Sequence, residues 1–359
     1  MSDVELAVSA PGRICLLGEH QDYLGLSIIA AAINLRISVS GKRRKDCTFK
    51  INLPDIGDIE EFSFEKELKY NKERDYLKSS INVLHRKGIK FLSGWDCLIH
   101  GNIPINSGTA SSSSLTVAWI KFLLEAANDI KAKEKKDIAE LSFLAEVDEF
   151  KEPGGKMDHY TSSLGDVIFI NFGKARKIQK FKNPLKEFVL ADSLQKKDTT
   201  GMIGYIKHHV LQGVSSIQKK IKDFSLESPL KQEVLDEIEK IPQEEKKLLK
   251  GTLLTRDLTQ KGKTLFDSED FDHAQLGCLL SQQHEVLRDY LNVSTPKIEQ
   301  MIEAALEAGA IGAKINGSGG GGCIFAYTPK EAKKVTEVLK KLGAQTYIIH
   351  VDEGVRKDI

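Results

Sequence analysis

Residues 101–118, GNIPINSGTASSSSLTVA, combine small residues, four consecutive serines and the start of a helix. From Leu115 onward, apolar residues recur at spacings of three and four, which is the period of a helix with one buried face. The serines therefore form the first turn, whose free N–H groups and partial positive charge attract anions. We predict a phosphate-binding site with hydroxyls available for a metal. The alternative is that serine and glycine only cap and punctuate the helix.

A second polar cluster, GEHQDY at residues 18–23, places Glu19, His20, Asp22 and Tyr23 just before an apolar segment. Carboxylates accept hydrogen bonds from hydroxyl groups, and imidazole can donate or accept. A site that binds hydroxyls in this way strongly rejects analogues that lack them. The cluster favours a ligand rich in hydroxyl groups, and the alternative is an ordinary hydrophilic loop.

Two further acids lie in and after a predicted helix at residues 137–150. Asp158 follows a Pro-Gly-Gly break and precedes a short helix or turn, so it is either a functional loop residue or a capping residue. Glu146 shares the polar face of the helix with Ser142 and Glu149. The helical pattern alone predicts that Glu146 is a solvated charge.

A dense glycine run lies in residues 313–327, AKINGSGGGGCIFAY, between a predicted helix and a predicted strand. Fixing so many glycines costs much chain entropy, which argues against an ordinary connector. The run suits a backbone that passes close to a ligand or to another loop.

The elements around these motifs alternate between strands and helices. We predict a strand, a turn at residues 10–12 and a second strand within residues 5–18, and a further strand at 90–100 that leads into the serine stretch. Later strands are expected at 167–172, 188–192 and 323–327. The basic, proline-containing residues 173–184 are the candidate boundary between two domains, which a chain of 359 residues favours.

Composition excludes several classes of protein. The chain has 41% hydrophobic and 29% charged residues and a net charge of +1, so we expect a globular protein with no nucleic-acid or membrane partner. Acidic residues interrupt the N-terminus before any signal peptide could form, and the longest apolar run, 24–35, is too short to span a bilayer. Five scattered cysteines without a CxxC pair predict a reduced, cytoplasmic protein with no zinc site.

Three separated motifs together resemble a known family. APGRICLLGEHQDY, IPINSGTASSSSLTVA and KINGSGGGGC look like the three signature motifs of the GHMP small-molecule kinases, in their usual order. GEHQDY, GGKMDHY and VSTPKIEQMIEAAL resemble the galactokinase branch more than mevalonate or homoserine kinases. The resemblance implies an α+β fold of two domains with the active site between them. Residues 1–183 would form a domain like ribosomal protein S5 domain 2, and residues 184–359 a ferredoxin-like domain.

The resemblance also implies roles for individual residues. Asp158 stands at the position of the catalytic base, and Arg13 at that of the arginine beside it, which would keep the acid ionised. The implied sugar site consists of Glu19, His20, Asp22 and Gly155. The implied ATP site consists of Gly108, Ala110, Ser111, Ser112, Ser113, Ser114, Gly317 and Gly319. Ser112 and Glu146 stand where the family binds magnesium, so ATP and Mg²⁺ are the expected cofactors.

The implied activity is ATP-dependent phosphorylation of a sugar at its anomeric hydroxyl, which needs positioning and charge neutralisation. The chain departs from the galactokinase pattern at Glu73 and Leu24 and lacks the expected tyrosine and arginine pair after DSLQKKD. Another sugar or sugar acid is therefore as reasonable a substrate as galactose. The alternatives are a mevalonate-type kinase and a catalytically silent sugar-binding regulator.

Overall fold

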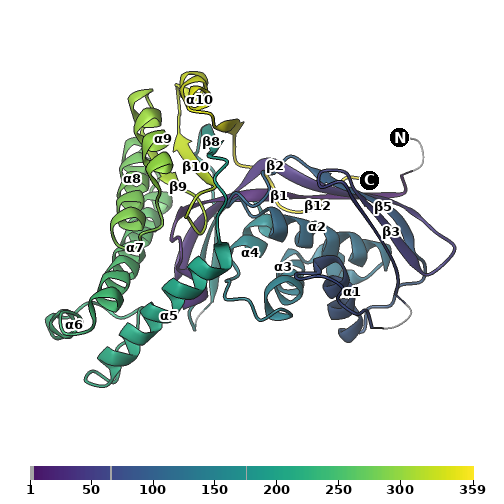
Figure 1. Ribbon diagram of the computed structural model, residues 1–359, viewed down its shortest axis with the longest axis horizontal. Coiled ribbons are helices and arrows are strands. Elements are labelled where there is room, and N and C mark those ends of the chain that lie inside the picture. Colours follow the sequence, from purple (N-terminus) through teal and green to yellow (C-terminus); the bar gives the residue numbers. More distant parts are fainter. Residues whose placement is uncertain (1–3, 65–66, 175) are drawn as a thin grey trace.

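The computed structural model describes residues 4–64, 67–174 and 176–359, which form two β-sheets with helices packed on them (Figure 1). The eight-stranded sheet belongs mostly to the first half of the chain, and the four-stranded sheet to the second half. The mixed fold of two parts agrees with the α+β prediction. No helix in the described ranges is long and apolar enough to cross a membrane.

The larger sheet has the strand order β12-β1-β2-β5-β3-β4, with β6 and β7 extending from β2. Most neighbours are antiparallel, and β3 runs parallel to β5. Its strands are β1 (Leu6–Leu17), β2 (Ser27–Arg43), β3 (Thr48–Leu53), β4 (Asp58–Ser63), β5 (Trp95–Gly101), β6 (Val167–Asn171), β7 (Lys177–Phe181) and β12 (Arg356–Lys357).

Four α-helices of the first half lie together below this sheet in Figure 1. They are α1 (Tyr76–Arg86), α2 (Ser111–Ala126), α3 (Lys135–Phe143) and α4 (Met157–Leu164). Short helical turns cover Asp22–Leu24 and Ile130–Lys133, and a π-helical turn covers Leu144–Asp148. Phe49 of β3 and Trp119 and Phe122 of α2 are fully buried, so aromatic side chains fill the space between helix and sheet.

The smaller sheet has the order β11-β8-β10-β9 and is antiparallel throughout. Its strands are β8 (Phe188–Asp192), β9 (Gly312–Ile315), β10 (Cys323–Tyr327) and β11 (Gln345–Ile349). Helices separate the first strand from the second and the third from the fourth, which is the ferredoxin-like β-α-β-β-α-β arrangement. These helices are α5 (Thr199–Gln218), α6 (Gln232–Ile238), α7 (Gln243–Asp267), α8 (His273–Asp289), α9 (Pro296–Glu307) and α10 (Ala332–Lys341).

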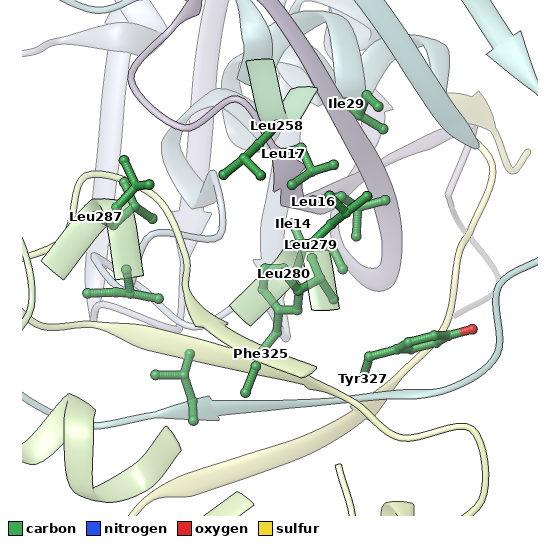
Figure 2. Packing of buried hydrophobic residues seen from close by; sticks show 14 of the residues in the cluster. Ile14, Leu16, Leu17, Ile29, Leu258, Leu279, Leu280, Leu287, Phe325 and Tyr327 are labelled. Carbon is green, nitrogen blue, oxygen red and sulfur yellow. The ribbon is translucent and has the colours of Figure 1, made fainter. Parts of the chain in front are cut away.

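One hydrophobic core joins the two sheets. In Figure 2, Leu16 and Leu17 of β1 lie among leucines of α7 and α8 and near Phe325 of β10. Helix α7 approaches β1 closely at Gly262, where a Cβ would lie 2.2 Å from Leu17 Cδ1 and would displace that buried side chain. The two sheets therefore share one core.

The structure corrects the prediction for the first strands. The residues Ala10, Pro11 and Gly12 do not break the chain into two strands, because β1 runs continuously from Leu6 to Leu17. The pairing with β2 shifts by two residues between Pro11 and Arg13, with the extra residues on β2, so the ladder is irregular next to the proline. The predicted boundary at residues 173–184 contains β7, which pairs with β6 in the larger sheet. The chain end also returns to this sheet as β12, which pairs with β1.

Candidate active site

A cleft between the two halves collects most of the residues singled out in the sequence. One wall is the segment before α2, whose helix begins at Ser111 as predicted. Ala110, just before it, has a left-handed backbone with φ of 64°, and no side chain caps the first turn. A strained non-glycine residue often marks a functional loop, and uncapped N–H groups at a helix start can bind an anion. This geometry favours the phosphate-binding interpretation over the capping one.

The four serines divide between the cleft and the interior. The cleft lining includes Ser111, Ser112 and Ser113. Ser114 is fully buried outside the cleft, and its hydroxyl donates to the carbonyl of Pro11 at 2.8 Å. Three of the four predicted ATP contacts from this run therefore face the cleft, and Ser114 instead attaches α2 to β1.

Arg13 and Asp158 form a two-pronged ion pair in the cleft. Arg13 Nε and Nη2 donate to the two carboxylate oxygens of Asp158, each at 2.7 Å. Burial lowers the pKa of Arg13, but the charges of Asp158 and Glu19 outweigh it, and the net direction is upward. The side chain of Asp158 keeps 27% of its surface exposed, whereas that of Arg13 keeps 4%. The pair therefore presents a carboxylate that is fixed in direction and open to a ligand.

The three sequence motifs meet at one carbonyl, that of Gly108. It accepts hydrogen bonds from Arg13 Nη1 and from Asn316 Nδ2, the latter at 2.8 Å. Gly108 has φ of +90°, and a Cβ there would lie 2.4 Å from Asn316 O. Only glycine allows this approach between the phosphate loop and the glycine-rich loop. Gly317 also lines the cleft, whereas Gly319 lies against Val293 outside it.

Glu146 is buried, and the pattern-based prediction of a solvated charge is wrong. It lies in the π-helical turn Leu144–Asp148, which adds a residue and rotates later side chains by about 100° from α-helical phase. His159 Nε2 donates to its Oε2 at 2.8 Å. Burial raises the pKa of Glu146, but His159 and the hydroxyls of Ser112 and Ser113 outweigh it and hold that pKa below its usual value.

The predicted sugar-binding residues lie in the cleft, and two of them also bind the glycine-rich loop. Glu19 accepts from Lys314 Nζ at 2.5 Å and from the backbone N–H of Gly317. His20 Nε2 donates to the carbonyl of Ser318 at 3.2 Å, so its Nδ1 accepts from the hydroxyl of Tyr23 at 2.8 Å. Their contact with a sugar stays a prediction.

Asp22 and Gly155 are tightly coupled. Asp22 Oδ2 accepts from the backbone N–H of Met157 at 2.9 Å, at the start of α4. A Cβ on Gly155 would lie 2.0 Å from this same oxygen, so glycine makes room for the carboxylate. Burial and the charge of Asp158 raise the pKa of Asp22 more than the Met157 bond and Arg13 lower it. Both residues line the same cleft as the Arg13–Asp158 pair, and their contact with a substrate stays a prediction.

Burial of His20 predicts a dependence of stability on pH. Burial lowers the pKa of His20 from 6.5 to about 4, so the unfolded chain binds a proton more readily than the folded one. The stability that neutral His20 contributes to the fold is fully present above pH 6.5. It is lost as the pH falls towards 4, by up to about 3 kcal/mol. Urea unfolding between pH 7 and 4 should show a smaller loss for His20→Gln than for the unmodified protein. The exposed His208, changed to Gln, is the control, and equal pH dependence for all three proteins would contradict the prediction.

Several cleft residues were missed by the sequence analysis. They include His159 beside Glu146, Lys197 in the segment after β8, and an ion pair at 2.6 Å between Arg74 and Glu152. Arg74 also donates to the hydroxyl of Thr200 on α5 and so connects the two halves. The only available signal was the adjacency of these residues to recognised motifs, such as His159 following Asp158.

Comparison with known proteins agrees with this arrangement. The GHMP kinase N-terminal domain matches residues 75–166, and the GHMP kinase C-terminal domain matches residues 257–345. The chain belongs to the GHMP kinases. The galactokinase galactose-binding signature matches residues 2–43, which include Arg13, Glu19, His20 and Asp22. The chain is therefore a galactokinase-like member of this family, a sugar-kinase type of phosphotransferase.

Similar proteins cover nearly the whole chain. A galactokinase from Mannheimia succiniciproducens is 28% identical over 376 aligned positions, covering 99% of this chain and 92% of the relative. A mevalonate kinase from Pyrococcus furiosus is 26% identical and covers 98% of both chains. The structure of Lactococcus lactis galactokinase with galactose superposes with a TM-score of 0.84 at 22% identity, covering 99% of this chain and 95% of that one. A mevalonate kinase structure gives a TM-score of 0.71 at 22% identity, covering 97% of this chain and 99% of that one.

Proposed function

We propose that this galactokinase-like kinase transfers the terminal phosphate of ATP to the anomeric hydroxyl of galactose or of a related sugar or sugar acid. The observation that carries the proposal is the position of Asp158. Its carboxylate is held by two bonds from Arg13, and it lines the same cleft as Asp22 and the uncapped start of α2. A sugar hydroxyl bound between the Asp158 carboxylate and the start of α2 would have a proton acceptor on one side and a phosphate on the other.

In the proposed reaction, Asp158 accepts the proton of the attacking hydroxyl as the bond to phosphorus forms. Arg13 fixes the carboxylate in the required direction, and the backbone around Gly108 and Ser111 holds the phosphates. Phosphoryl transfer depends mainly on positioning and on stabilisation of charge, and this arrangement provides both. Asp22 and the side chains near it would bind the other hydroxyls of the sugar.

The residues near the start of α2 fit a magnesium ion. Glu146 and Ser112 both line the cleft, and the Ser112 hydroxyl helps to lower the pKa of the Glu146 carboxyl, so both can offer an oxygen ligand beside the start of α2. His159 binds one carboxylate oxygen and orients the group. Mg²⁺ prefers such oxygen ligands together with substrate phosphates, and when bound it would neutralise phosphate charge.

A substrate panel tests this proposal. ADP release should occur with at least one hexose, pentose or uronic acid, and the corresponding methyl glycoside should give none, because its anomeric oxygen carries no proton. A new coupling between the anomeric proton and phosphorus in the product spectrum would identify the 1-phosphate.

The same panel separates the alternatives. Reaction with mevalonate alone would replace the proposal by a mevalonate-type kinase, for which the Pyrococcus furiosus relative is the supporting observation. Tight sugar binding without any ADP release would instead favour a silent regulator.

A further inference from the structure

Lys197 is the one cation of the cleft lining in the described ranges that has no acidic partner. Three others line the cleft or lie directly behind it, and each is paired: Arg13 with Asp158, Arg74 with Glu152, and Lys314 with Glu19. The ammonium group of Lys197 makes a single bond of 3.2 Å, to the neutral hydroxyl of Ser318. A partly buried charge without a counter-ion is unfavourable, so this group is available to an anionic ligand.

The location of this ammonium group is set by both phosphate-side loops. A Cβ built on Gly108 would lie 2.9 Å from Lys197 Nζ, so the missing side chain of Gly108 leaves room for it. Ser318 belongs to the glycine-rich loop, and the segment carrying Lys197 is attached to that loop through the carbonyl of Gln195, which accepts from Gly322 at 3.2 Å. The lysine therefore lies where the phosphate loop and the glycine-rich loop meet.

Arg13 is poorly placed to neutralise the phosphate itself. Its Nε and Nη2 bind Asp158, and its Nη1 binds the carbonyl of Gly108, so each of its three nitrogens already donates to protein. The side chain is also almost completely buried. Arg13 thus orients the base, and a second cation is needed for the charge that develops on the transferred group.

We propose that Lys197 binds the terminal phosphate of the nucleotide and stabilises its charge during transfer. The inference rests on the proposed kinase function and deepens it. The transferred phosphoryl group must lie between the phosphate loop and the acceptor hydroxyl at Asp158, and Nζ lies beside both Gly108 and the Arg13–Asp158 pair. Charge-assisted bonds to a phosphate in such a place are strong.

The electrostatics of the free cleft agree with this role. Burial and the charge of Arg13 lower the pKa of Lys197 to about 8. The other ionisable groups around it are Asp158, Glu19, Cys323 and His20. A triphosphate bound at Nζ would raise this pKa, so binding at pH 8 should take up a fraction of a proton.

The test measures binding without turnover. Isothermal titration with Mg²⁺ and adenylyl imidodiphosphate, a non-hydrolysable ATP analogue, should show roughly 10- to 100-fold weaker binding for Lys197→Met. The affinity of Lys197→Met for ADP and for the sugar should each fall by less than about threefold. Lys197→Arg should recover most of the affinity for the ATP analogue. The exposed neighbour Lys196, changed to Met, is the matched control and should bind like the unmodified protein.

A second readout is the proton uptake at pH 8. The binding enthalpy of the analogue should vary with the ionisation enthalpy of the buffer for the unmodified protein, and this dependence should vanish in Lys197→Met. Any of three results for Lys197→Met would overturn the inference: equal losses of affinity for the ATP analogue and for ADP, an unchanged affinity for the analogue, or a loss of affinity for the sugar alone. Failure of the unmodified protein to bind any nucleotide would instead overturn the proposed function.

Discussion

Replacing Asp158 by asparagine should lower kcat by roughly 10²- to 10⁴-fold, the usual contribution of a positioned general base. Asparagine has almost the same shape and can still accept one bond from Arg13, so the fold and the cleft should persist. Only the proton acceptor is removed. Steady-state kinetics with the sugar identified by the panel will measure the effect, and titration with the ATP analogue should show nearly unchanged affinity.

Asp166 provides the matched control for this substitution. It lies outside the cleft lining, its side chain is 45% exposed, and it pairs with Lys180 at 2.9 Å. Its left-handed backbone, with φ of 61°, also suits asparagine. Asp166→Asn should therefore keep full activity. A kcat for Asp158→Asn within threefold of the unmodified protein would remove Asp158 from the proton-accepting role.

Local signals were sufficient to predict much of the cleft. The apolar period after Leu115 placed the start of α2 at the serines, and the Pro-Gly-Gly break predicted a short helix or turn directly after Asp158, which corresponds to α4. The glycine run was expected to approach another loop, and the contact between Asn316 and Gly108 is such an approach. The start of α2 and the loop contact were predictable because helix starts and glycine loops depend on neighbouring residues, whereas Asp158 was expected just before the short helix and lies inside its first turn.

Other features depend on contacts that no local pattern contains. The π-helical turn brought Glu146 to the buried side, whereas regular helical spacing predicted the exposed one. Pro11 was read as a break because proline usually interrupts a sheet, yet pairing of β1 with β2 continues on both sides of the irregularity. In both cases a local irregularity inside a regular element changed the outcome: a π-helical turn at Glu146 and a two-residue shift of β2 beside Pro11.

Lys197 and Lys314 were missed because their partners are distant in the sequence. Lys197 reaches Ser318, which is 121 residues away, and Lys314 reaches Glu19, 295 residues away. The sequence analysis assigned Glu19 to the sugar site from its neighbours, His20 and Asp22. The structure adds that Glu19 also binds the glycine-rich loop. This contact forms because hydrogen bonds of Cys15 with Lys314 and Asn316 attach the end of β1 to that loop.

This connection leads to the second large effect that we expect. Lys314 and Glu19 are almost completely buried, with 0% and 1% of their side chains exposed. Lys314 Nζ also donates to the carbonyls of Cys15 and Ile315, each at 2.9 Å, so its three protons all have acceptors. Lys314→Met would leave the carboxylate of Glu19 without its counter-ion and should lower the free energy of unfolding by about 3–5 kcal/mol.

Urea unfolding of Lys314→Met, Glu19→Gln and the double variant measures this pair. The exposed Lys333 on α10, changed to Met, is the control and should stay within about 0.5 kcal/mol of the unmodified protein. The free energy of unfolding of the double variant should fall by less than the sum of the two single decreases, because removing both charges leaves no unpaired ion. The side-chain carbonyl oxygen that Glu19→Gln retains can still accept from the backbone N–H of Gly317, so the contact with the glycine-rich loop should be kept. Additive losses, or a loss below 1 kcal/mol for Lys314→Met, would show that the buried pair does not couple the first motif to the glycine-rich loop.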